Sequence, residues 1–220
     1  IIATLNRLQQ TGIDNVFIET YFHGKTIFPS KTMAAYGFTT QYEKFAGIDP
    51  LEIWIREAHK RGIKVHTWFE TFYAGNQSPN DNPNSILAKN PSWGNKTKKD
   101  YASTLPSKST SEHNGYFLDP ANPYVQDFIA KLTEEIITRY KPDGINLDYI
   151  RYPNTVGTNE MSSWGYTEYA RNDFKNIFGV DPIDLVKSDP LWLEWNNYRR
   201  EKVTNMVKKI GDQGRRTNTY

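Results

Sequence analysis

Apolar residues recur at two spacings in the first third of the chain. From Ile2 to Leu8 they lie three residues apart, which is the spacing of one face of a helix. Two short runs rich in aromatic and β-branched residues, 15–22 and 63–70, predict strands. Between them, the segment D-P-L-E at 49–52 has an N-cap aspartate, a proline at the first helical position and a glutamate that completes a capping box. The chain therefore begins with helix, strand, helix and strand.

The alternation continues after a long polar stretch at 74–114. A helix is predicted to start at the Asn-Pro pair 122–123, and a third strand at 144–150. Further helices are predicted near 166–178 and at about 191–210. Strands that alternate with helices run parallel and are joined by right-handed crossovers. The pattern thus predicts an α/β fold, either a closed barrel or an open doubly wound sheet.

The loops around the predicted strands indicate where a site would lie. No glycine-rich phosphate-binding loop follows any strand, which argues against nucleotide binding. The connections before the strands are short, as at 61–62 and 141–143, whereas those after the strands are long. Barrel enzymes build their sites from the loops at the C-terminal ends of the strands. We therefore expect functional residues at that end.

Composition and charge exclude several classes of protein. The chain has 220 residues and a net charge of +2 with both signs scattered, which is not the basic footprint of a nucleic-acid-binding protein. It has no cysteine, which excludes disulfides, thiolate metal sites and a cysteine nucleophile. No apolar run approaches the roughly 20 residues that cross a bilayer. No G-x-S-x-G serine motif is present, and no cofactor is expected.

Side chains alternate along each strand, which separates an apolar face from a second face with acidic, amide or histidine side chains. In the first strand this second face takes Glu19 together with Tyr21. In the second strand it takes Trp68 and Glu70, and in the third strand Asp148. In a closed barrel the second face points inward. Each strand then contributes one acid near its C-terminal end.

Glu19, Glu70 and Asp148 would gather at one mouth of such a barrel, with His66 and Asn146 a layer below. Burial of a carboxylate costs several kcal/mol unless the group is paired with a cation or has a role in binding or catalysis. Glycoside hydrolysis needs two carboxyl groups, one protonated as general acid and one ionised. Crowding raises the pKa of one carboxyl and helps to separate those roles. The three acids are therefore candidate catalytic residues.

Two other interpretations of these acids stay open. Arg151 or Lys25 could neutralise them in a charge network that only holds loops. His23, His66 and a carboxylate could form a metal site, which would indicate a metal-dependent hydrolase such as an amino-sugar deacetylase. The chain has only 4 histidines and no H-x-H or H-E-x-x-H pattern, so no metal is expected.

Three tryptophans are candidate sugar contacts. Trp68 faces inward on its strand, as a sugar platform or as a residue that fills the barrel core. Trp93 and Trp164 lie in the long loops after strands, where exposed aromatic rings contact ligands and buried ones anchor the loop. If these rings bind a sugar and the chain does not hydrolyse it, the chain is a non-catalytic carbohydrate-binding barrel.

Four sequence blocks resemble those of the bacterial glycosyl-hydrolase-like family 10. They are G-K-T-I-F-P-S at 24–30, V-H-T-W-F-E at 65–70, L-D-P-A-N-P-Y-V at 118–125 and G-I-N-L-D-Y-I-R-Y-P at 144–153. The last block is fairly specific, and the other three are convincing together. The resemblance implies a (β/α)8 barrel and a glycosidase that acts on a bacterial or other complex polysaccharide, such as cell-wall glycan. It also implies an exported protein, extracellular or in the cell envelope.

The resemblance places the acidic strand-end residue of the family on Asp148, with Arg151 and Tyr152 shaping the same pocket. Tyr149 and Asn146 in the same block are expected to contact the sugar. We expect the same of His23, Lys25 and His66, which lie on or just after the first two strands. Residues 1–220 are expected to form a single catalytic domain, the N-terminal portion of the barrel. The first strand of the family would precede residue 1, and its later strands would follow the last helix.

Overall fold

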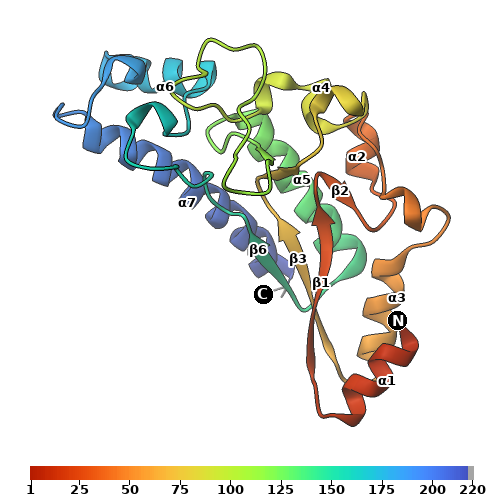
Figure 1. Cartoon of the computed structure of the whole chain (residues 1–220). Helices are drawn as coiled ribbons and strands as arrows, with labels where there is room; N and C mark the ends of the chain where they lie inside the picture. The colour runs from red at the N-terminus through yellow and green to blue at the C-terminus, as the bar shows by residue number, and fades with distance from the viewer. Residues whose placement is uncertain (218–220) are drawn as a thin grey trace. The chain divides into compact units, whose positions relative to one another are not determined.

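The computed structural model describes residues 1–217 except for the side chain of Asn80 (Figure 1). The helices are α1 (Ile2–Gln10), α2 (Lys31–Ala35), α3 (Pro50–His59), α4 (Ile86–Lys89), α5 (Pro123–Tyr140), α6 (Glu168–Phe178) and α7 (Trp192–Thr217). The strands are β1 (Asn15–Phe22), β2 (Lys25–Thr26), β3 (Lys64–Glu70), β4 (Tyr73–Gly75), β5 (Tyr116–Phe117) and β6 (Gly144–Asp148). The chain forms two compact units, one of Ile1–Thr71, Ile129–Asp148 and the segment from Lys209, the other of Phe72–Phe128 and Tyr149–Lys208.

The first unit is built on a four-stranded sheet in the order β2-β1-β3-β6. β1, β3 and β6 run parallel and lie side by side, and β2 pairs antiparallel with the end of β1 (Figure 1). α3 connects β1 to β3 and α5 precedes β6, so strands and helices alternate as the sequence predicts. The sheet is not closed, and the fold is that of an incomplete (β/α) barrel.

The predicted start of α3 is confirmed. The Asp49 side chain accepts a hydrogen bond from the Glu52 N–H, which satisfies one of the free donors of the first turn. Leu51 and Ile55 are buried on the face of α3 that packs on β3. The chain leaves the helix through Gly62, whose φ of 70° is a left-handed conformation that glycine adopts at little cost.

The first strand departs from strict alternation. β1 pairs with β3 from Asn15 to Glu19, and the register then shifts between Glu19 and Tyr21, as in a β-bulge. Beyond the shift, Tyr21 pairs with Phe69 and stacks on its ring, with the two ring centroids 4.5 Å apart. The prediction that Tyr21 shares a face with Glu19 is therefore wrong, because the irregularity around Thr20 turns Tyr21 to the apolar face.

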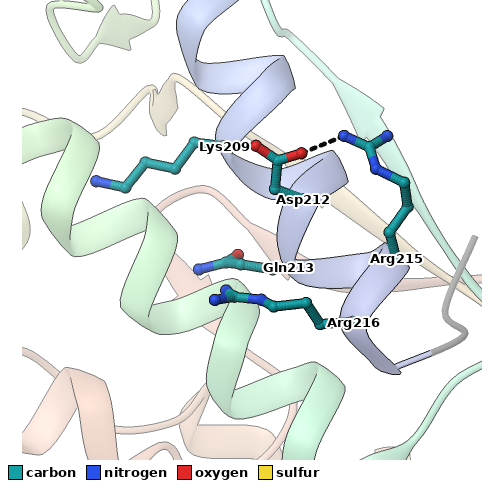
Figure 2. A pocket seen from close by; sticks show the side chains of 5 residues that line it. All are labelled: Lys209, Asp212, Gln213, Arg215 and Arg216. Carbon is teal, nitrogen blue, oxygen red and sulfur yellow. Dashed lines mark hydrogen bonds and ion pairs between the residues drawn. The ribbon is translucent and has the colours of Figure 1, made fainter.

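The last helix is longer than predicted, since α7 continues to Thr217 rather than to about 210. Near its end the buried Gln213 accepts a hydrogen bond from the Thr133 hydroxyl at 2.8 Å and donates one to the Ala130 carbonyl at 2.9 Å. These bonds tie the end of α7 to α5. A surface cavity of about 520 Å³ lies there (Figure 2), lined by Lys209, Asp212, Gln213, Arg215 and Arg216. Cations are favoured at this end by the helix dipole.

The second unit consists largely of the long connections after the strands. Within the predicted polar stretch lie the short elements β4 and α4, and β4 pairs antiparallel with β5. Its core is aromatic, with Trp195 of α7 packed edge-on against Phe174 of α6 and beside Tyr166. Across the described residues, no helix has the length and apolar character needed to cross a membrane.

Candidate active site

Parallel pairing brings the predicted acids onto neighbouring strands of the first unit. Glu70 of β3 pairs in register with Asp148 of β6. Trp68 pairs with Glu19 of β1 on one side and with Asn146 of β6 on the other. Paired residues of a parallel sheet project their side chains to the same face. Glu70 and Asp148 therefore form one row at the C-terminal end of the sheet, with Glu19, Trp68 and Asn146 in the row below.

Glu70 is the most buried of the three acids, with 7% of its surface exposed. One of its carboxylate oxygens accepts a hydrogen bond from the backbone N–H of His23 at 2.7 Å. His23 follows β1 with a φ of 50°, which is unusual for a residue other than glycine. The pKa of Glu70 is raised to about 7, mainly because the group is buried. The hydrogen bond from His23 lowers this pKa, whereas the negative charges of Glu19 and Asp148 raise it. Glu70 thus keeps its proton close to neutral pH.

Asp148 is held at the end of β6 through its side chain and its main chain. Trp68 Nε1 donates a hydrogen bond to Asp148 Oδ2 at 3.0 Å. The Asp148 carbonyl accepts another from the Thr71 N–H at 2.8 Å. The strand stops here rather than at the predicted residue 150, because Tyr149 has a φ of 47° and a left-handed residue does not continue a strand. The carboxylate therefore has a defined position beside Glu70.

The remaining predicted residues of the first unit contact other side chains. His66 Nε2 lies 3.0 Å from the Asn15 side-chain oxygen, and the His66 ring stacks on Phe17 at 4.8 Å. His66 pairs with Phe17 in the register and so lies a further row below Trp68. Lys25 forms an ion pair with Glu43 at 3.2 Å. In residues 1–217, no three His, Asp or Glu side chains group as metal ligands do.

Predicted residues of the second unit have contacts of their own. Arg151 forms an ion pair with Glu112 at 2.5 Å and lies over the Tyr149 ring. The Tyr152 hydroxyl is buried and, within the described part of the chain, lacks a hydrogen-bond partner. Burial raises the pKa of Tyr152 well above its ordinary value, and the nearby charge of Asp119 adds to this effect. Tyr152 is therefore a neutral, buried phenol.

Trp93 and Trp164 are both buried. The Trp93 ring packs against Phe128 with centroids 5.7 Å apart. The Trp164 indole N–H donates to the Asn154 carbonyl at 3.2 Å. Both contacts lie within the second unit and fit the alternative that these rings anchor their own loops.

Sequence reasoning missed Asp119, a fully buried acid of the second unit. Its carboxylate accepts hydrogen bonds from the Thr167 hydroxyl at 2.5 Å and from the Ala121 N–H at 2.9 Å. Burial raises the pKa of Asp119 to about 6, although both hydrogen bonds lower it. The Asp119-Pro120 pair could have indicated this turn in the sequence, since an aspartate side chain commonly accepts a hydrogen bond from the backbone N–H two residues later. The buried partner Thr167 had no signal in the sequence.

Comparisons with known proteins agree with one another. The sequence profile of the family described as Glycosyl hydrolase-like 10 matches residues 1–215. Glycosyl hydrolase DigH of Escherichia coli K12 is 32% identical over 170 residues, which are 77% of this chain and 38% of DigH. Glycosyl hydrolase YngK of Bacillus subtilis is 27% identical over 216 residues, which are 95% of this chain and 36% of YngK. The chain thus spans less than two fifths of the length of these relatives.

Solved structures show the same fold. The α-L-fucosidase isoenzyme 2 from Paenibacillus thiaminolyticus matches 95% of this chain with a TM-score of 0.62, and the match covers 26% of that protein. The sequence identity is 18%, so the likeness concerns the fold alone. It confirms the predicted incomplete (β/α) barrel.

Proposed function

This chain belongs to the glycosyl hydrolase-like 10 family, and from that premise we propose that it hydrolyses glycosidic bonds, with Glu70 as general acid and Asp148 as the ionised carboxylate. The reaction requires two carboxyl groups in opposite protonation states. One observation carries the proposal, namely that neighbouring carboxyl groups on β3 and β6 have different surroundings. Glu70 is buried with a pKa of about 7, whereas Asp148 is less buried and accepts a hydrogen bond from the Trp68 indole.

In the proposed reaction, the Glu70 carboxyl donates its proton to the oxygen of the leaving sugar while the bond between that oxygen and the anomeric carbon breaks. The negative charge of Asp148 stabilises the positive charge that develops on the sugar ring. Water supplies a hydroxyl group to the anomeric carbon and, in net, the proton that returns Glu70 to its acid form. The products are two shorter saccharides.

Other side chains would support this pair. Trp68 orients Asp148 through the indole hydrogen bond. Glu19 contributes a negative charge that helps Glu70 to retain its proton. We assign a sugar contact to Asn146, in the row below Glu70 and Asp148.

The substrate class rests on the family. We propose that the whole protein acts on a complex polysaccharide, with bacterial cell-wall glycan as the first candidate. An extracellular or cell-envelope location follows from such a substrate. Both statements concern the whole protein, of which this chain resembles a part.

The test is the release of reducing ends by the full-length protein from peptidoglycan glycan strands, chitin-like polymers and plant polysaccharides. Glu70→Gln and Asp148→Asn each remove one of the two roles, so each should lower the rate by at least about a hundredfold. Glu52→Gln is the matched control, because Glu52 is an exposed glutamate on α3 whose nearest cation, Arg56, is 3.8 Å away.

Release that is lost in both site variants and kept in the control would support the proposal. The site variants must retain the circular dichroism spectrum of the unchanged protein. Release that survives Asp148→Asn would place the chemistry elsewhere. Binding of a polysaccharide without any release would contradict hydrolysis and favour a carbohydrate-binding barrel.

A further inference from the structure

A second cavity lies entirely within the long loops of the second unit and contains none of the acids described above. Its volume is about 230 Å³, which is below the roughly 300–1,000 Å³ of sites for drug-sized ligands and suits a small unit such as one sugar ring. Three segments line this loop pocket, namely residues 97–100, 108–110 and 154–164. They belong to the connections after β3 and β6, where the sequence predicts functional residues.

The walls of the loop pocket are held by backbone pairing. Thr97 forms an antiparallel bridge with Trp164. The Lys99 N–H donates to the Met161 carbonyl at 2.9 Å, which joins the first segment to the third. The Trp164 indole donates to the carbonyl of Asn154 at the other end of the third segment. The pocket therefore has a fixed frame although it is built from loops.

The charged side chains of the loop pocket favour an anion. Lys99 and Lys108 line it, and neither ammonium group has a carboxylate partner in the part of the chain that the structure describes. The only acid in the lining is Asp100, whose Oδ2 already accepts hydrogen bonds from the hydroxyls of Thr97 at 2.9 Å and Ser107 at 2.8 Å. The lining thus carries two lysines, one of which lies with its ammonium group 6.0 Å from the centre of the Tyr116 ring, against one carboxylate that already accepts two hydroxyl hydrogen bonds.

The rest of the lining suits a saccharide. Val156 and Met161 are unusually exposed for apolar residues, at 54% and 43%, and both line the pocket beside the buried Trp164. Apolar side chains of this kind pack on the C–H face of a sugar ring, whereas Thr110 and Asn154 offer polar groups for its hydroxyls. A small inorganic anion would leave the apolar part unused.

We infer that the loop pocket is an accessory site that binds the carboxylated sugar unit of an acidic saccharide, with Lys99 and Lys108 on the carboxylate and Val156 and Met161 on the ring. The choice of a saccharide over other anions rests on the proposed function. Binding at this site needs no turnover, so the two ideas are tested separately.

Isothermal titration calorimetry of the full chain carrying Asp148→Asn compares trigalacturonate with its fully methyl-esterified form, which has the same backbone without charge. We expect trigalacturonate to bind at least about tenfold more tightly, because each carboxylate can form charge-assisted hydrogen bonds with an ammonium group. The double variant Lys99→Met and Lys108→Met should remove that preference. The matched control is Lys89→Met with Lys175→Met, since both lysines are exposed, lie in the second unit and do not line the pocket.

Equal binding of the acid and the ester would overturn the inference, as would an unchanged preference in the pocket variant. An equal loss in the control variant would reduce the effect to net charge and overturn it as well. A tripeptide of glutamate that binds as tightly as trigalacturonate would show that the pocket selects charge and not a sugar. If trigalacturonate binds as expected while the unchanged protein releases no reducing ends, the loop pocket stands and the proposed hydrolysis fails.

Discussion

The carboxyl group of Glu70 holds its proton up to about pH 7, because burial raises its pKa and the negative charges of Glu19 and Asp148 raise it further. A general acid acts only in its protonated form. The contribution of Glu19 is electrostatic and does not require that Glu19 touch the substrate. In the proposed mechanism, the pH dependence of the activity is therefore set in part by a residue one row away from Glu70 and Asp148.

We predict that kcat/KM falls as the pH rises through about 7, where Glu70 loses its proton. Glu19→Gln removes one of the charges that raise this pKa, so the fall should move to lower pH. The measurement is a pH–rate profile of the full-length protein on the substrate found above, with Glu52→Gln as control. A fall that stays at the same pH in Glu19→Gln would show that Glu70 is not the acid or that Glu19 does not affect it.

At the scale of secondary-structure elements, the short helix α2 depends on α5. A helix of five residues is not stable by itself. Glu135 of α5 accepts hydrogen bonds from the Ser30 hydroxyl, the Lys31 N–H and the Thr32 N–H, at 2.7, 2.7 and 2.9 Å. Burial raises the pKa of Glu135, but these hydrogen bonds outweigh it and leave the pKa below its ordinary value. One ionised side chain thus caps the first turn of α2.

Glu135→Ala should lower the free energy of unfolding by about 1–2 kcal/mol at neutral pH, since it removes a charged acceptor from the backbone donors of the first turn of α2. A folded-state pKa below the unfolded value stabilises the fold above the unfolded pKa and is lost as the pH falls. The difference between the two proteins should therefore shrink as the pH drops below 4.5. Urea unfolding measures both effects.

Glu134→Ala serves as the control for this prediction, because Glu134 is the exposed neighbour on the same helix. An equal loss in both variants would mean that helix propensity, and not the cap, explains the effect. A difference that is constant from pH 7 to pH 3 would contradict the ionised cap.

The sequence predicts elements well where the signal is local. Strand parity correctly groups Trp68 with Glu70, because alternation within one strand needs no partner. It fails for Tyr21, because the bulge depends on how β1 pairs with β3. It also misses Asp119, whose partner Thr167 is distant in the chain. The roles of the candidate site residues stay predictions, since geometry alone does not test them.

At the scale of the whole molecule, the parallel sheet has an open face and is not closed into a barrel. Phe17 of β1 projects from that face with 56% of its surface exposed. Exposed aromatic residues on an open sheet favour association with other chains. The open sheet is therefore the part of this chain that should control its solubility.

We predict that the 220-residue chain associates with itself as its concentration rises, and that Phe17→Thr reduces this association without loss of the fold. Threonine keeps the preference for a strand and removes the apolar ring. Light scattering after size-exclusion chromatography gives the mass at each concentration. Ile177→Thr, at an equally exposed position on α6, should leave the association unchanged. Association that is the same in all three proteins would show that the sheet face is not responsible.

The hydrogen bond to Glu70 comes from the peptide N–H at position 23 and not from an imidazole. Every residue except proline carries that donor, and glycine or asparagine would adopt the left-handed backbone with less strain than histidine. A change of residue 23 to glycine or asparagine would therefore keep the donor to Glu70. Anyone who transplants the acid pair into a new scaffold must therefore copy the turn and its direction as well as the two carboxyl groups.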